Sequence, residues 1–114
     1  MEQTRRYQLK LKTLVKAVTG FKSLMEVDIS GFNETLQDGI QNGQIQKFEY
    51  STELLWKTIR EYLLTFHQIE SVSPKSAISE FLNTKNIDEP MYELLINMIK
   101  DRNTAMFTKR KIIL

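Results

Sequence analysis

The 114-residue sequence has no cysteine, one histidine, two prolines and four glycines. The absence of cysteine excludes a disulfide framework, a thiol nucleophile and a cysteine-ligated metal, and it is typical of a reducing compartment. A histidine-based metal site or catalytic triad would have to rest on His67 alone. No apolar run approaches the roughly 18 residues of a membrane span, and the start MEQTRRYQLKLK lacks the apolar stretch of a signal peptide. We therefore expect a soluble cytoplasmic protein without a metal, a cofactor or a membrane segment.

What the chain does contain is an ordinary globular composition, with 41% hydrophobic and 26% charged residues, which at this length suits one domain. The formal net charge of +2 depends on Lys109, Arg110 and Lys111, because without these three the 16 basic residues fall to 13 against 14 acidic ones. We therefore predict a single helical domain over residues 1–108 and a basic and apolar tail over residues 109–114. The overall charge is weak evidence for a nucleic-acid partner.

Apolar residues at steps of three and four predict helices and no strand. The first helix is expected from about Thr4 to Val27, on a stripe made of Leu11, Leu14, Val15, Val18, Phe21 and Met25. A second helix begins after a cap at Ser30 or Asn33, and its glycines, Gly39 and Gly43, predict a kink or a frayed start. Its pattern is strong from Ile45 to Phe66, where Glu53, Lys57, Arg60 and Glu61 fall off the apolar stripe.

Two further helix starts follow. Ser73 is expected to cap a third helix, with Pro74 in its first position. The segment Asn86-Ile87-Asp88-Glu89-Pro90 precedes a fourth helix, whose apolar face is Met91, Leu94, Leu95, Met98 and Ile99. The predicted fold class is therefore all-α, an up-and-down four-helix bundle.

Few side chains could carry chemistry. His67 falls where the second helix is expected to end, a place that suits a cationic side chain, so a structural role is favoured. Glu49 and Glu53 are one turn apart, as in carboxylate metal sites of bundles, but no Glu-x-x-His partner exists and an ion-paired or solvated face is favoured. Lys57 follows Glu53 by four residues, the spacing of a surface ion pair. Trp56 is expected in the core.

The segment KFEYSTELLWKTIREYL, from Lys47 to Leu63, resembles the signature RFE(F/Y)xxELxWKxLxxYL of the nucleotidyltransferase substrate-binding protein family, a branch of the HEPN superfamily. The order of the other features agrees with that family: a long first helix, Ser73-Pro74, and a last amphipathic pattern that ends in Asp101-Arg102-Asn103. The resemblance covers nearly all of residues 5–104.

The resemblance implies a small helical protein, usually a homodimer, that partners a minimal nucleotidyltransferase and binds its substrate, with a nucleotide or RNA as candidate ligand. It makes Glu49, Glu53, Trp56, Lys57 and Arg102 the candidate substrate- or partner-binding residues. Related pairs act as toxin–antitoxin systems, in which the HEPN protein is an RNase and the nucleotidyltransferase silences it by adenylylation.

In the HEPN family the chemistry belongs to an Arg-Asn-x-x-x-His-x-Tyr motif, which this chain keeps only in part. Arg102 and Asn103 match, while Phe107 and Lys109 stand at the histidine and tyrosine positions. Phenylalanine cannot transfer a proton, and lysine has no phenol to be adenylylated. We therefore expect a binding or regulatory subunit rather than an enzyme. The alternatives are a degraded RNase toxin that has lost its His-x-Tyr and, more weakly, a nucleic-acid adaptor that uses the basic tail.

The residues after Asn103 raise a further hypothesis. The family continues beyond the motif with another helix, for which this sequence has no pattern. One choice of codons for Met106 to Lys111 reads His-Val-Tyr-Glu-Lys-Glu in the neighbouring frame, which would restore His-x-Tyr with one residue fewer before the histidine. We interpret the end of the chain as truncated or frameshifted, with a natural short variant as the alternative. In either case the remaining helices are expected to expose an apolar patch.

Overall fold

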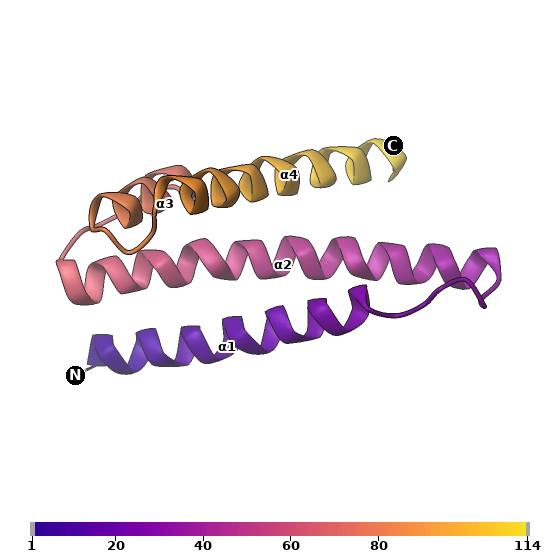
Figure 1. The fold of residues 1–114 in the computed structure, drawn as a ribbon, viewed down its shortest axis with the longest axis horizontal. Helices are drawn as coiled ribbons and strands as arrows, with labels where there is room; N and C mark the ends of the chain where they lie inside the picture. Colours follow the sequence, from indigo (N-terminus) through magenta and orange to yellow (C-terminus); the bar gives the residue numbers. More distant parts are fainter. Residues whose placement is uncertain (1, 114) are drawn as a thin grey trace.

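The computed structural model describes the backbone of residues 2–113 and the side chains of residues 2–103. Its helices are α1 (Glu2–Met25), α2 (Glu34–His67), α3 (Pro74–Asn83) and α4 (Glu89–Ile113), and the described residues contain no strand. α2 lies between α1 on one side and the α3–α4 pair on the other, and the long helices alternate in direction (Figure 1). The predicted all-α bundle is confirmed.

Polar caps define the helix boundaries. Asn33, one of the two predicted candidates, starts α2 by accepting a hydrogen bond from the Leu36 N–H at 2.9 Å. Ser73 caps α3, with Pro74 in the first turn as predicted. Asp88 accepts from the Met91 N–H at 2.9 Å at the start of α4. α2 ends at His67, and the following residue, Gln68, closes it in the left-handed conformation with φ 55°.

α2 passes both of its glycines without interruption, so the predicted kink or frayed start is wrong. Nothing lies near the position of a Cβ at Gly39, whereas a Cβ at Gly43 would lie 3.3 Å from Cδ2 of Leu24. Gly43 therefore marks a close approach of α1 to α2. The packing of α1 along this part of α2 outweighs the weak helix propensity of glycine.

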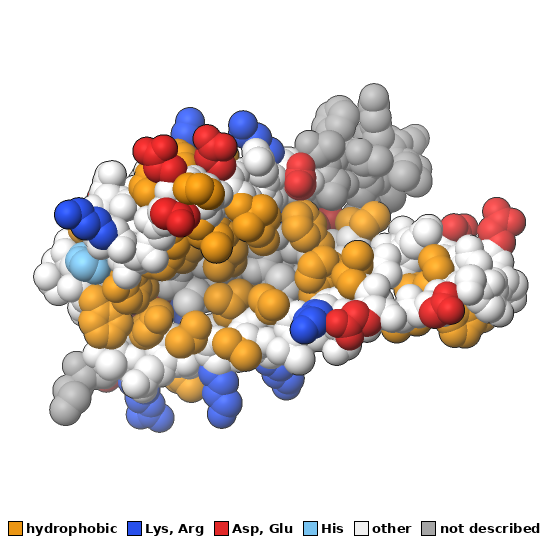
Figure 2. Space-filling view, in the orientation of Figure 1, with side chains coloured by type: hydrophobic (Ala, Val, Ile, Leu, Met, Phe, Trp, Pro, Cys, Tyr) orange, Lys and Arg blue, Asp and Glu red, His pale blue; other side chains and the backbone are white. Residues whose placement is uncertain are grey.

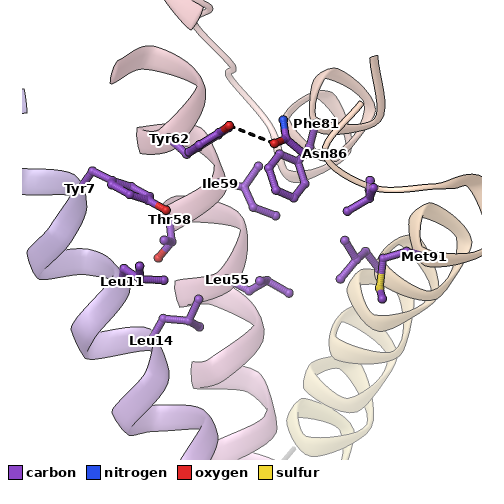
Figure 3. A pocket seen from close by; sticks show the side chains of 12 residues that line it. Tyr7, Leu11, Leu14, Leu55, Thr58, Ile59, Tyr62, Phe81, Asn86 and Met91 are labelled. Atoms are coloured by element: carbon purple, nitrogen blue, oxygen red, sulfur yellow. Dashed lines mark hydrogen bonds between the residues drawn. The ribbon is translucent and has the colours of Figure 1, made fainter. Parts of the chain in front are cut away.

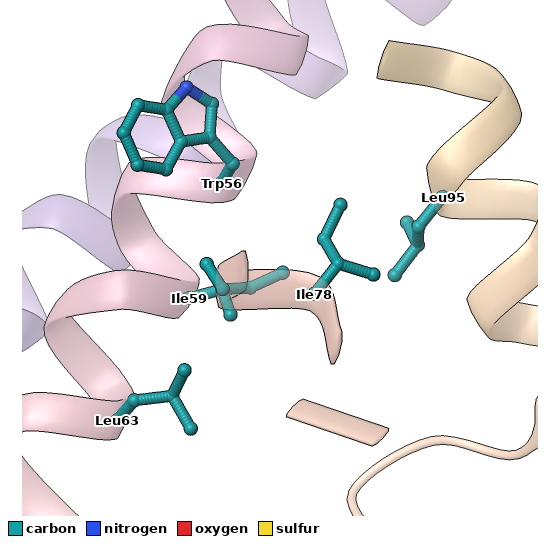
Figure 4. Close-up of a cluster of buried hydrophobic side chains, with 6 residues drawn as sticks. Trp56, Ile59, Leu63, Ile78 and Leu95 are labelled. Atoms are coloured by element: carbon teal, nitrogen blue, oxygen red, sulfur yellow. The ribbon is translucent and has the colours of Figure 1, made fainter. Parts of the chain in front are cut away.

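The core lies where α2 meets α3 and α4 (Figure 4). Its buried hydrophobic side chains are Trp56, Ile59 and Leu63 from α2, Ala77 and Ile78 from α3, and Leu95 from α4. The prediction that Trp56 belongs to the core is confirmed. Full burial of an aliphatic side chain stabilises a fold by about 1.5–3 kcal/mol. The junction of α2, α3 and α4 therefore contributes strongly to the stability of the molecule.

α1 is attached in a different way. It packs on α2 alone, and none of its described residues, Glu2–Met25, is fully buried. Aromatic rings fasten it: the ring centroid of Tyr7 lies 5.7 Å from that of Tyr62 and 5.4 Å from that of Phe66. The two long helices are therefore joined along one face, without a third element over α1.

This arrangement divides the predicted stripe of α1. Leu14 and Phe21 are half-buried, and Phe21 lies 6.0 Å from Phe48 between ring centroids. The remaining members of the stripe stay exposed: Leu11, Val15, Val18 and Met25. α1 therefore carries more apolar surface than its contact with α2 covers.

One residue of α2 that the sequence places off the apolar stripe is buried. Glu61 is 6% exposed, and its Oε1 lies 3.8 Å from Nη1 of Arg6 on α1. The cause is the position of α1, which covers this polar edge of α2. Over the described residues, no helix combines the length and the apolar character needed to cross a membrane.

Candidate functional site

The spacing of polar residues in the signature segment has a direct structural consequence. Trp56 and Lys57 follow Glu53 by three and four residues, so the three side chains stand on one face of α2. Trp56 Nε1 donates a hydrogen bond to Glu53 Oε2 at 3.1 Å, and Lys57 Nζ lies 3.2 Å from Glu53 Oε1. The predicted Glu53–Lys57 ion pair is therefore present, and the indole of Trp56 holds the same carboxylate.

α4 supplies a third partner to this carboxylate. Arg102 Nη2 lies 2.9 Å from Glu53 Oε2, with the Arg102 side chain 20% exposed and the Glu53 side chain 29% exposed. Asn103 is exposed, and its Oδ1 accepts from Arg102 Nη1 at 3.4 Å. The Glu53–Arg102 ion pair thus joins the signature segment on α2 to the Arg-Asn pair on α4.

The surroundings of Glu53 keep it ionised. Partial burial raises its pKa, but the hydrogen bonds from Trp56 and Lys57 and the positive charges of Arg102 and Lys57 outweigh that effect, so the pKa of Glu53 lies below its usual value. At neutral pH this side chain is a hydrogen-bond acceptor and an anion. It is poorly suited to act as a general acid.

An open hollow of about 280 Å³ lies beside the ion pair, lined by Gln46, Glu49, Tyr50, Glu53 and Arg102. Two atoms of the lining residues, Glu49 Oε1 and Arg102 Nε, are buried and have no hydrogen-bond partner among the described residues. A buried polar atom left unpaired costs about 1–3 kcal/mol. The two unpaired atoms therefore belong to residues that line the hollow, one as an acceptor and one as a donor.

The structure brings most of the predicted site residues together, but in different roles. Glu49, Glu53 and Arg102 line the hollow, and Lys57 reaches it through its ion pair with Glu53. Trp56 is 8% exposed and lies in the core, and its indole N–H donates to Glu53.

Sequence reasoning missed two residues of the lining, Gln46 and Tyr50. They are four residues apart, on the face of α2 that also carries Glu49 and Glu53, and this spacing was the available signal.

The other candidates take no part in this site. His67 is exposed at the end of α2, with its ring centroid 5.5 Å from that of Tyr62. Within the described part of the chain, no three His, Cys, Asp or Glu side chains are grouped so that they could hold a metal ion. The side chains of Phe107 and Lys109, which replace the motif histidine and tyrosine, lie outside the described residues, as do those of residues 109–114.

Comparison with known families and structures agrees with this architecture. A family model described as "Nucleotidyltransferase substrate binding protein like" matches residues 9–108. The match spans most of the chain, so the protein belongs to the nucleotidyltransferase substrate-binding protein family. A crystal structure of a protein from Thermus thermophilus is similar, with a TM-score of 0.71 and 24% sequence identity over 86% of this chain and 77% of that chain. That likeness concerns the fold alone. A comparison with curated proteins gives no match.

Proposed function

We propose that the protein is a non-catalytic, substrate-binding subunit that pairs with a minimal nucleotidyltransferase through the face of α2 and α4 carrying Glu53 and Arg102. Family membership supports the class of partner. The observation that carries the choice of face is the hollow beside the Glu53–Arg102 ion pair, two of whose lining residues, Glu49 and Arg102, each keep a buried polar atom without a partner among the described residues. The pairing belongs either to a two-component nucleotidyltransferase or to a toxin–antitoxin system of the HEPN type.

The chemistry of the hollow suits a ligand that offers both donors and acceptors. Arg102 Nε is an unpaired donor, which matches a phosphate or carboxylate oxygen. Glu49 Oε1 is an unpaired acceptor, which matches an amino group such as that of a nucleobase. A nucleotide carries both kinds of group, and Tyr50, which is 56% exposed, offers a ring at the edge of the same hollow. Binding, with Glu53 ionised, is the role that these groups support.

The test uses a minimal nucleotidyltransferase from the same genome. The two proteins are purified, mixed at micromolar concentration and followed by size-exclusion chromatography with light scattering, and their affinity is measured by calorimetry with and without ATP. We expect a stable complex that Glu49→Gln and Arg102→Gln each weaken about tenfold, which corresponds to about 1.4 kcal/mol. Glu26→Gln, an exposed carboxylate after α1, is the matched control and should leave the affinity unchanged.

Two results would contradict the proposal: no complex at any concentration, or equal affinity for all four proteins. Cleavage of RNA by the unaltered chain would favour a surviving RNase instead, and a variant with Phe107→His and Lys109→Tyr serves as its positive control. We also infer that the subunit is a homodimer, as its family resemblance implies. Light scattering should give twice the chain mass of 13.4 kDa, and a monomer at every concentration would show that this is wrong.

A further inference from the structure

Charge is distributed unevenly along the chain. Residues 1–25 contain six basic residues and one acidic residue, whereas residues 26–108 contain seven basic and thirteen acidic ones. The nearly neutral total over residues 1–108 therefore combines a first segment of net +5 with a remainder of net −6. The acidic residue of the first segment, Glu2, lies in the first turn of α1, so no negative charge interrupts the basic residues that follow it.

Three of these basic residues form a row on the side of α1 that faces away from α2. Tyr7 and Leu14 are half-buried and point toward α2 (Figure 3). Arg5, Lys12 and Lys16 each stand two residues from Tyr7 or Leu14, which is about 200° round the helix. Their spacings of seven and four residues place them one after another along the same side. All three are exposed. We call Arg5, Lys12 and Lys16 the outer row.

The charges of the outer row are not neutralised within the described part of the protein. None of its three residues forms an ion pair there, whereas Arg6 on the same helix is paired with Glu61. Among the described residues α1 packs on α2 alone, so no other helix covers the row. Basic side chains project from the edge of the molecule that α1 forms (Figure 2). The acidic residues of α4 lie on the other side of α2, and salt screens exposed charges beyond about 8–10 Å.

The surroundings of the outer row favour the phosphates of a duplex as its ligand. The aromatic residues of α1, Tyr7 and Phe21, are half-buried against rings of α2, so the outer face has no ring on which an unpaired base could stack. The exposed apolar residues Leu9 and Val15 lie on opposite sides of the row. A membrane would therefore meet charge at the centre of this face, the reverse of an interfacial helix. A nucleic-acid duplex needs neither stacking nor an apolar centre.

The shape of α1 favours DNA over RNA. α1 has 24 residues and is about 36 Å long, and its outer half is free of other helices within the described residues. The major groove of B-form DNA is about 12 Å wide and admits an α-helix, whereas the corresponding groove of A-form RNA is too narrow. The outer row runs about 16 Å along the helix axis, and duplex DNA carries one negative charge per about 1.7 Å. DNA therefore offers enough phosphates to pair with all three cations.

We propose that the outer row of α1 binds the phosphate backbone of double-stranded DNA. Contacts from lysine and arginine to phosphates position a protein on a duplex but do not read its bases, so the binding is independent of sequence. Three such contacts correspond to a slope of about −2.7 for log affinity against log salt concentration, and to a dissociation constant of about 10⁻⁴–10⁻⁶ M at physiological salt. The inference rests on the placement of charge and does not depend on the nucleotidyltransferase pairing or on the Glu53 hollow.

The experiment titrates a fluorescein-labelled DNA duplex of about 20 base pairs with the full chain and follows fluorescence anisotropy at salt concentrations between about 50 and 200 mM. We expect the affinity to fall about fortyfold over that range, as a slope of about −2.7 requires. The unlabelled competitors are an RNA duplex of the same sequence, a single DNA strand, poly-glutamate and phosphatidylglycerol vesicles, all at equal charge. Each should displace the labelled duplex less well than unlabelled duplex DNA does.

Two matched variants locate the binding. Lys12→Gln combined with Lys16→Gln removes two of the three phosphate contacts and should reduce the slope to about −0.9. Lys75→Gln combined with Lys85→Gln removes the same charge from two exposed lysines outside α1 and should leave the slope unchanged. All four side chains are exposed, so neither variant is expected to disturb the fold.

The proposal is overturned if the duplex does not bind at the lowest salt concentration, or if any competitor displaces it as well as duplex DNA does. It is also overturned if the Lys12 and Lys16 variant keeps the slope of the unaltered chain. A further variant, Lys109→Gln with Arg110→Gln and Lys111→Gln, tests the basic tail and should bind as the unaltered chain does. Loss of binding in this variant alone would assign the DNA contact to the tail and overturn the role of α1.

Discussion

Glu53 accepts a hydrogen bond from Trp56 on its own helix and forms an ion pair with Arg102 on α4. One carboxylate therefore makes a contact within α2 and a contact between α2 and α4. The lowered pKa of Glu53 makes this contribution depend on pH. Since the folded pKa is depressed, the stabilisation is complete above the unfolded-state value of about 4.3 and is lost as the pH falls through the folded value.

Replacement of Glu53 by Gln therefore has a pH-dependent effect. At pH 7, Glu53→Gln should lower the free energy of unfolding by about 1 kcal/mol, since the pair is partly exposed and screened by solvent. At pH 3 the difference from the unaltered protein should be smaller, because the stability contributed by ionised Glu53 declines as the pH falls below the unfolded-state pKa. Urea unfolding at both pH values measures this, and an equal difference at both would show that charge is not the cause.

Burial predicts a second contrast between single residues. Ile78 is completely buried between α2 and α4, whereas Leu94 on α4 is 54% exposed. Ile78→Ala should lower the free energy of unfolding by about 2–5 kcal/mol. Leu94→Ala should change it by less than about 0.5 kcal/mol. Chemical unfolding of both variants tests the comparison, and similar losses would mean that Leu94 is covered in solution.

At the scale of elements, both helix propensity and packing against a neighbouring helix determine the stability of α2. Its glycines lie one turn apart, yet only Gly43 has a neighbour within contact distance. A substitution at Gly39 therefore tests the helix propensity of α2 alone. A substitution at Gly43 also tests the packing of α1 against α2.

Alanine at each glycine should give different results. Gly39→Ala should raise the free energy of unfolding by about 0.5–1 kcal/mol, because alanine has the higher helix propensity and open space receives its methyl group. Gly43→Ala should give a smaller gain or a loss, since Leu24 must shift to admit the methyl group. Thermal unfolding followed by circular dichroism compares them. A larger gain at Gly43 would show that α1 does not lie against α2 there.

At the scale of the whole molecule, local contacts could be predicted from the sequence and distant ones could not. The helices, their caps and the Glu53–Lys57 pair follow from spacings of three or four residues, as does the core position of Trp56. The Glu53–Arg102 ion pair and the burial of Glu61 depend on where α4 and α1 dock, which no local pattern records. The resemblance pointed to Arg102 and the signature, but the hollow between them became visible only in the folded chain.

The overall dimensions of the molecule also depend on packing that local sequence patterns do not predict. The radius of gyration is 16.3 Å, against about 13 Å for a compact domain of about 100 residues. The stripe on α1 was predicted as one apolar face, yet only part of it contacts α2. Hydrophobic periodicity identifies the apolar face of a helix, but it does not identify which side chains of that face are buried against another helix of the same chain.

The one-sided attachment of α1 also sets the order in which the molecule opens. With one packing neighbour and no fully buried residue among Glu2–Met25, α1 should detach as a unit while the joint around Leu63 and Ile78 stays closed. Its backbone amides should exchange with deuterium at a lower free energy than those of α2 near Leu63, measured by native-state exchange in low denaturant. Uniform protection along both helices would contradict this.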